Sequence, residues 1–177
     1  MKTRSRRRLG GFTLTELMIA VVILGVLAAV ASAGYGSYIR RARASEARTQ
    51  LAAIAARETA YRSEFGVFCG AGRSGVPTTT GISNAWPTAT PGQNADFNAS
   101  APTQWAELGF RPSGRVRFRY VVVPGAPGAT PPGETSPAGD LWYVAEAYSD
   151  LDGDSTLSTF RHYSLGPGVV AVGSETE

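Results

Sequence analysis

Cysteine and histidine are almost missing from this chain of 177 residues, which contains one of each, Cys69 and His162. One cysteine excludes a disulfide within the chain, and one cysteine with one histidine cannot build the usual zinc clusters. The sequence shows neither a serine–histidine–aspartate or cysteine–histidine catalytic signature nor a glycine-rich phosphate loop of either common pattern. We therefore predict that the protein is not an enzyme.

Acidic residues are absent from the first eleven positions. Five of the 17 basic residues precede Phe12, whereas all 14 acidic residues follow it. Without that leader the chain has 12 basic and 14 acidic side chains and a formal charge of −2. The sequence pI of about 9.3 is thus partly a property of the leader, and it does not indicate a nucleic-acid-binding domain.

Charge is also missing from residues 17–39, directly after a single glutamate, Glu16. A helix of about 20 apolar residues spans a bilayer. An ionised carboxylate inside hydrocarbon costs about 2.5–3.5 kcal/mol, so Glu16 needs a partner. A secretory signal peptide would place its small residues after a shorter apolar core, but Gly10 and Gly11 come before this run. The basic leader favours a cytoplasmic N-terminus and an exported remainder, although Arg40 and its neighbours weaken the bias.

Neither proline nor glycine occurs in residues 40–65, where alanine, arginine and glutamate predominate. Apolar residues recur there at spacings of three and four and form one stripe: Ala47, Leu51, Ile54, Ala55, Tyr61 and Phe65. We therefore predict one helix over residues 13–65, interrupted or loosened near residues 32–36. Its first half belongs in lipid or among other helices, and its second half packs on a globular head.

The head follows in residues 66–177. Residues 66–113 predict a long surface loop, rich in small and polar residues and anchored by Trp86, Phe97 and Trp105. Residues 114–124, 141–148 and 157–165 predict strands with short links, which favour an antiparallel meander. With the helix laid on its apolar face, the fold class is α+β, with a small antiparallel sheet of about three to four strands in residues 114–165.

Two features of the head suggest ligands. Arg115, Arg117 and Arg119 alternate along the first strand and could contact DNA phosphates. They could instead form a solvated sheet face or pair with acidic neighbours in a filament. The other feature is the acidic loop, residues 150–156, in which Asp150, Asp152 and Asp154 alternate around a glycine. Such loops bind calcium through oxygen ligands, or they form an aspartate–glycine turn between strands.

The run Gly11-Phe12-Thr13-Leu14-Thr15-Glu16-Leu17-Met18-Ile19, the apolar span after it, and Tyr61-Arg62-Ser63-Glu64-Phe65-Gly66-Val67-Phe68 at the helix exit resemble the type IV prepilin family. That family includes the related pseudopilins of type II secretion. The resemblance implies that a prepilin peptidase cuts between Gly11 and Phe12 and methylates the new amine of Phe12. It also implies that Glu16 pairs with the Phe12 amine of a neighbouring subunit. Some pseudopilins hold calcium in a C-terminal loop, and some pilin-like proteins take part in DNA uptake.

Two departures from the family are visible. Many pilins carry a proline in the span near the position of Ala33, where this chain has Gly34 and Gly36 close by. Many major pilins close a C-terminal loop with a disulfide, which this chain cannot form.

We predict a leader (residues 1–11), a long helix (residues 12–65) and an exported head (residues 66–177). The function expected is that of a structural subunit of a type IV pilus-like filament, with other pilin subunits, the peptidase and an inner-membrane assembly platform as partners. The subunit would start in the bacterial inner membrane and end in an extracellular pilus. One alternative is a secretion pseudopilin in a periplasmic pseudopilus. Another is a membrane-anchored module that binds DNA or a surface and does not polymerise.

Overall fold

A computed structural model describes residues 11–69, 85–99 and 101–173. The chain divides into two units, Met1–Ile39 and Arg40–Glu177, which are described in turn. The helix α1 (Leu14–Phe65) contributes to both units. Its bounds confirm the predicted helix to within a residue. The expected interruption is wrong, because residues 32–36 are helical.

In the first unit, the stretch Leu14–Ser32 of α1 is long and apolar enough to cross a membrane, and none of its side chains is buried within the chain. The exposed fraction of its large apolar side chains is at least one half, as at Ile23 with 54%. Its apolar surface is therefore not used for packing inside the chain.

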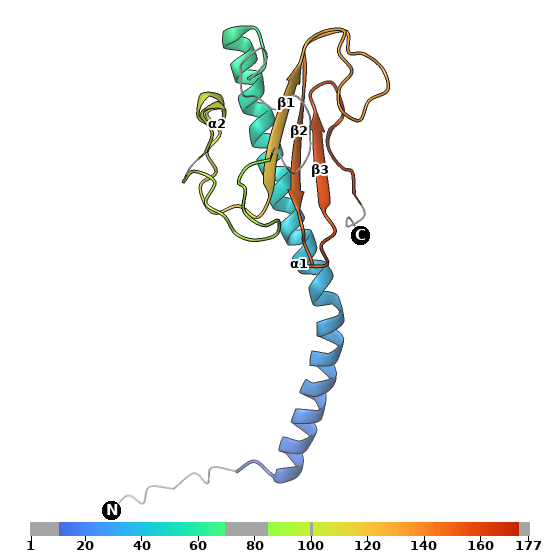
Figure 1. The fold of residues 1–177 in the computed structure, drawn as a ribbon. Coiled ribbons are helices and arrows are strands. Elements are labelled where there is room, and N and C mark those ends of the chain that lie inside the picture. The colour runs from blue at the N-terminus through green and yellow to red at the C-terminus, as the bar shows by residue number, and fades with distance from the viewer. Residues whose placement is uncertain (1–10, 70–84, 100, 174–177) are drawn as a thin grey trace, which may run out of the picture. The chain divides into compact units, whose positions relative to one another are not determined.

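The second unit is built on a four-stranded antiparallel sheet in the order β1-β2-β3-β4. Figure 1 labels the first three of these strands, which lie side by side. The strands are β1 (Arg119–Gly125), β2 (Trp142–Ser149), β3 (Ser158–Tyr163) and β4 (Gly168–Ala171). Tyr120 lies opposite Ala147, and Ala145 lies opposite His162. The α+β prediction and the meander are confirmed, with β4 lying beyond the range expected for the sheet.

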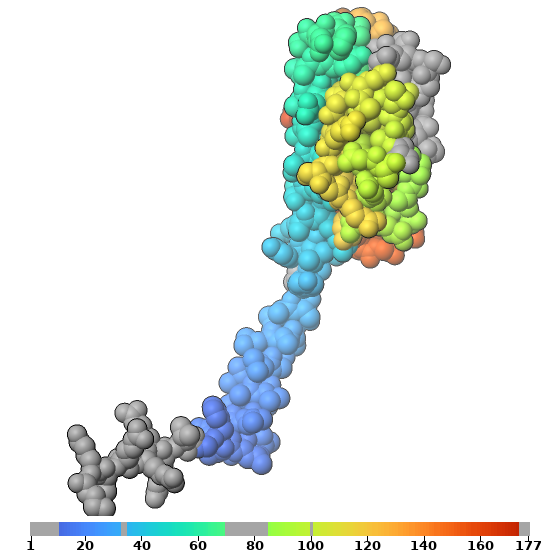
Figure 2. Space-filling view, turned by 90° about the vertical axis from the view of Figure 1, so that its left-hand side faces the viewer, coloured from blue at the N-terminus to red at the C-terminus, as the bar shows by residue number. Residues whose placement is uncertain are grey.

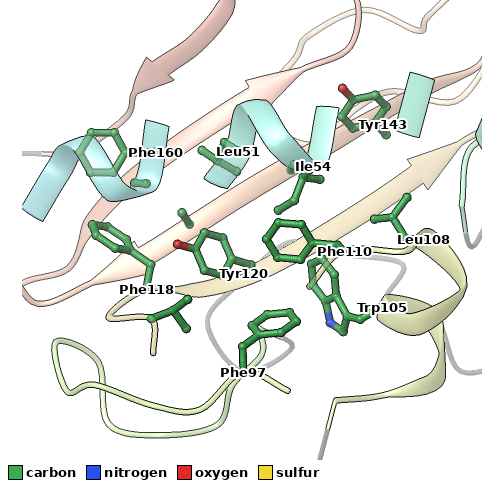
Figure 3. Packing of buried hydrophobic residues seen from close by; sticks show 14 of the residues in the cluster. Leu51, Ile54, Phe97, Trp105, Leu108, Phe110, Phe118, Tyr120, Tyr143 and Phe160 are labelled. Carbon is green, nitrogen blue, oxygen red and sulfur yellow. The ribbon is translucent and has the colours of Figure 1, made fainter. Parts of the chain in front are cut away.

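The second half of α1 packs on one face of this sheet. Ala47, Leu51 and Ile54 have no exposed surface, which confirms the predicted stripe. Figure 3 shows Leu51 and Ile54 facing the aromatic core, whose labelled rings are Phe97, Trp105, Phe110, Phe118, Tyr120, Tyr143 and Phe160. Phe65 does not belong to the stripe as expected, because 57% of it is exposed at the end of the helix.

The predicted loop 66–113 contains a short helix that the sequence analysis missed, α2 (Thr103–Leu108). Phe97 and Trp105 are buried and Trp86 packs against the core, so the predicted anchors are confirmed. Figure 2 shows this green and yellow segment lying beside α1 over one side of the head. Residues 70–84 of the predicted loop lie outside the described residues.

The other face of the sheet is buried as well. Val121, Val123 and Val144 point to that face, where Ala85 and Ala138 from loops cover them. Glu146 on β2 is 1% exposed there and forms an ion pair with Arg161, with Nη2 and Oε1 2.5 Å apart. Every residue of β2 is therefore buried.

The first predicted strand is shorter than expected. Residues 114–118 are outside β1, and Val116 forms an isolated bridge with Ala95 instead. Trp86 forms a second bridge, to Tyr120. The segment that carries Ala95 and Trp86 therefore pairs along the edge of the sheet beside β1.

Candidate functional site

The candidate site begins just before α1, at Gly11 and Phe12. Among the described residues other than its chain neighbour Phe12, no atom lies within 4 Å of the position that a Cβ on Gly11 would occupy. The side chain of Phe12 is 88% exposed. The peptide bond between the two residues is therefore open to a second molecule.

Thr13 and Glu16 close a reciprocal capping arrangement at the first turn of α1. The backbone N–H and the hydroxyl of Thr13 both donate to Oε2 of Glu16, at 2.9 and 2.8 Å. The N–H of Glu16 donates in return to Oγ1 of Thr13 at 3.2 Å. This is a capping box, which satisfies donors that a helix start leaves unpaired. This capping box was not predicted from the sequence, although threonine followed three residues later by glutamate is its signature.

The capping box shows that Glu16 has a partner within its own chain. A carboxylate in the first turn is also favoured by the helix dipole. The pairing of Glu16 with the Phe12 amine of another subunit involves a second chain, so it stays a prediction.

The arginine stripe contacts backbone carbonyl oxygens. Arg115 donates to Asn94, Arg117 to Gly92 and Arg119 to Ala85, at 2.8, 3.2 and 2.9 Å. All three acceptors belong to the segment that runs along the edge of the sheet. The stripe thus contacts this segment, with Arg115 exposed and Arg117 and Arg119 partly buried. Burial lowers the pKa of Arg119. Contact with nucleic acid stays a prediction.

The acidic loop brings its three predicted ligands together. One carboxylate oxygen from each of Asp150, Asp152 and Asp154 lies within 4.8 Å of the others. Some of these oxygens also accept N–H groups of the loop: Asp150 accepts from Gly153 at 2.6 Å and from Ser155 at 3.1 Å. The loop is therefore shaped by its own hydrogen bonds.

Two other segments brace the acidic loop. The guanidinium of Arg43 on α1 donates to the carbonyl oxygen of Leu151. Gly92, with φ of 83°, lies so close to the carbonyl of Asp150 that a side chain there would collide with it. The donor set of three carboxylates fits a hard cation such as calcium, which prefers oxygen ligands. Calcium binding itself stays a prediction.

The family model described as "Prokaryotic N-terminal methylation motif" matches residues 6–32. These residues include Gly11, Phe12 and Glu16, together with the apolar stretch Leu14–Ser32. The match therefore covers both the exposed peptide bond between Gly11 and Phe12 and the capping box.

Curated relatives point to the same family. The chain is 42% identical over 62 residues to the type IV major pilin protein PilA of Myxococcus xanthus (strain DK1622), covering 35% of this chain and 28% of the relative. It is 59% identical over 39 residues to a fimbrial protein of Moraxella nonliquefaciens, covering 22% and 25%. It is 60% identical over 37 residues to the type IV major pilin protein PilE1 of Neisseria gonorrhoeae, covering 21% and 22%. The chain thus spans about a quarter of the length of these relatives, and its N-terminal segment is similar to the corresponding segments of type IV pilins.

Proposed function

We propose that this chain is a structural subunit of a type IV pilus-like filament and polymerises through the first half of α1. The observation that carries the proposal is the stretch Leu14–Ser32, whose apolar side chains are all left exposed by the fold. In a membrane, lipid covers such a surface, and in a filament, neighbouring helices cover it by van der Waals packing.

Processing precedes assembly in this proposal. A prepilin peptidase cuts between Gly11 and Phe12, removes the basic leader (residues 1–11) and methylates the Phe12 amine. The exposure of Phe12 and the open space around Gly11 support this step. The leader faces the cytoplasm, the head (residues 66–177) is exported, and the inner-membrane assembly platform receives the processed subunit.

Glu16 then joins neighbouring subunits. Its carboxylate pairs with the Phe12 amine of the next chain, because a cation close by offsets much of the cost of a carboxylate in a low dielectric. This contact sets the register of one helix against the next.

The experiment must separate the charge of Glu16 from its capping role. Glu16→Gln keeps a side chain that can accept the Thr13 N–H but removes the charge, whereas Thr13→Ala weakens the cap and keeps the charge. We expect Glu16→Gln to be processed yet absent from fibres sheared from cells, and Thr13→Ala to enter them. Gly11→Glu serves as the processing control, and we expect it to keep its leader when its mass is measured.

The outcomes distinguish the steps. Normal entry of Glu16→Gln into fibres would refute the register role of the charge. If Glu16→Gln entered fibres and Thr13→Ala did not, the role of Glu16 would be helix capping alone.

Two alternatives remain. The braced acidic loop favours a pseudopilin of a type II secretion system, and deletion of the gene would then block secretion instead of removing surface fibres. A membrane-anchored module that binds DNA or a surface would be processed and yet never recovered in any fibre. Shearing the wild-type fibres and probing them for the chain decides between subunit and module.

A further inference from the structure

Glu58 is a carboxylic acid in the hydrophobic core of the head. It follows Ile54 by one helical turn on the buried stripe of α1 and has no exposed surface. Carboxylic acids are seldom fully buried unless they are paired, so this residue needs an explanation.

Only one oxygen of Glu58 is satisfied among the described residues. Oε2 accepts the backbone N–H of Cys69 at 2.9 Å, whereas Oε1 is buried and has no hydrogen-bond partner. The neutral acid tolerates such a place far better than the carboxylate, whose charge is cut off from water. Burial accordingly raises the pKa of Glu58 to about 7, although the Cys69 N–H acts in the opposite direction.

The residues that follow α1 are here called the exit segment (residues 66–69). The hydrogen bond from Cys69 to Glu58 connects this segment to the helix. Gly66 ends the helix with φ of 75° and donates its N–H to the carbonyl of Arg62 at 2.8 Å. Phe68 packs edge-on against Tyr143 of β2, with ring centroids 4.8 Å apart. Cys69 also places its thiol 3.6 Å from the carbonyl oxygen of Gln104 on α2. The exit segment thus joins α1, β2 and α2 at one point.

The groups around Glu58 do not supply a compensating cation. Tyr143 on β2 has its pKa raised, by burial first and by the charge of Glu58 second, so its hydroxyl stays protonated. His162 on β3 stacks on Tyr143, and burial lowers the pKa of the imidazole, which disfavours its charged form. Arg62 on α1 pairs with Asp140 at 3.0 Å and lies over the ring of Phe68. Among the residues that the structure describes, none forms an ion pair with Glu58.

Water is available close to the exit segment. Phe68, Tyr143, Arg62 and His162 contribute to the lining of an open cavity of about 310 Å³. If Phe68 moves away from Tyr143, the segment beside Glu58 opens toward this space, and an ionised carboxylate can be hydrated.

We propose that Glu58 is a proton-controlled switch for the exit segment, holding residues 66–69 on the head while it is protonated and favouring their release when it ionises. The released state carries a hydrated carboxylate, and the docked state carries a neutral acid. The switch is independent of filament assembly and acts within one subunit.

Hydrogen exchange of the full-length chain in detergent micelles tests the switch. The measured exchange rate divided by the intrinsic rate gives the equilibrium constant for opening. For peptides that cover the exit segment, this constant should rise about fifty- to a hundredfold from pH 5 to pH 8 and level off above pH 7. Peptides from β2 should not follow this curve. Glu58→Gln should make the opening independent of pH, whereas Glu64→Gln, an exposed glutamate on the same helix, should behave as the wild type.

A wild-type measurement covers the case in which Glu58→Gln does not fold. Carbon NMR of glutamate carboxyls should show one group that titrates near pH 7, with the amide shift of Cys69 following the same curve. Flat protection of the exit segment across this range, an unchanged pH profile in folded Glu58→Gln, or a Cys69 amide that does not follow a carboxyl titration would overturn the proposal.

Discussion

Along α1, the stretch Leu14–Ser32 leaves every large apolar side chain exposed, whereas residues 40–65 bury Leu51 and Ile54 on one stripe. The first part is apolar on all sides, and the second alternates apolar residues with arginine and glutamate. A stripe is what a helix needs to pack on one sheet, and an all-round apolar surface is what it needs among lipids or other helices.

The comparison shows how one continuous helix serves two environments. Changes in residues 40–65 should affect the stability of the head, and changes in Leu14–Ser32 should affect the membrane or the filament.

Leu51→Ala should destabilise the head by about 2–5 kcal/mol, because Leu51 is fully buried and its removal leaves a cavity in the aromatic core. The matched variant Leu24→Ala, in the exposed stretch, should leave the free energy of unfolding of the head within about 0.5 kcal/mol of the wild type. Urea unfolding in micelles measures both. An equal loss of unfolding free energy in the two variants would contradict this division of α1.

Glu58 should make the stability of the head depend on pH. The pKa of about 7 in the folded chain lies above the ordinary value of 4.5, so the folded state binds more protons between these two values. The stabilisation is complete below about pH 4.5 and is lost as pH rises to about 7, a change of about 3 kcal/mol.

Glu58→Gln should remove this dependence from urea unfolding measured at several pH values. A head that gains stability as pH rises from 5 to 7, in excess of Glu58→Gln, would contradict the assignment.

Calcium should stabilise the head by about 2.7 kcal/mol at a free concentration a hundred times its Kd, if the acidic loop binds it. Arg43 connects this loop to the second half of α1, so the effect should appear in the unfolding of the head. Thermal unfolding with calcium, with magnesium and with a chelator measures it. The shift should vanish in Asp152→Asn, and a melting temperature unaffected by the chelator would reject the site.

Asp140→Asn should have the smallest effect. Its partner Arg62 is partly exposed, and solvent screens such pairs. The hydrogen bond from Arg62 is the main reason that the pKa of Asp140 is lowered, so the small stabilisation is present at neutral pH and fades as the solution becomes acidic. Arg62→Met should cost more than Asp140→Asn, because Arg62 also lies over Phe68. The reverse order in urea unfolding would show that the ion pair outweighs the ring contact.

The features that could be predicted from the sequence are those with long, regular patterns of residues. The helix, the buried stripe, three of the strands and the meander follow from periodicity and from the placement of proline and glycine. Gly11, Phe12 and Glu16 follow from a local motif that does not depend on the fold. The capping box is equally local, because threonine followed three residues later by glutamate is its signature.

The missed features depend on tertiary contacts or on short elements. Helix α2 has six residues and β4 has four, too few to show a period. Glu58 has the spacing of the apolar stripe, but a glutamate at such a position is normally expected to be exposed. Val121 and Val123 follow the parity of the arginine stripe, and their burial depends on loops that only the folded chain brings over the sheet.

The box formed by Thr13 and Glu16 uses only one of the two carboxylate oxygens. Both Thr13 donors meet Oε2, so Oε1 can accept a donor from a neighbouring chain while the cap stays closed. If Glu16 joins subunits in this way, the cap orients the carboxylate before the neighbour arrives. The contact then chooses the register, while the apolar helix surface supplies the cohesion.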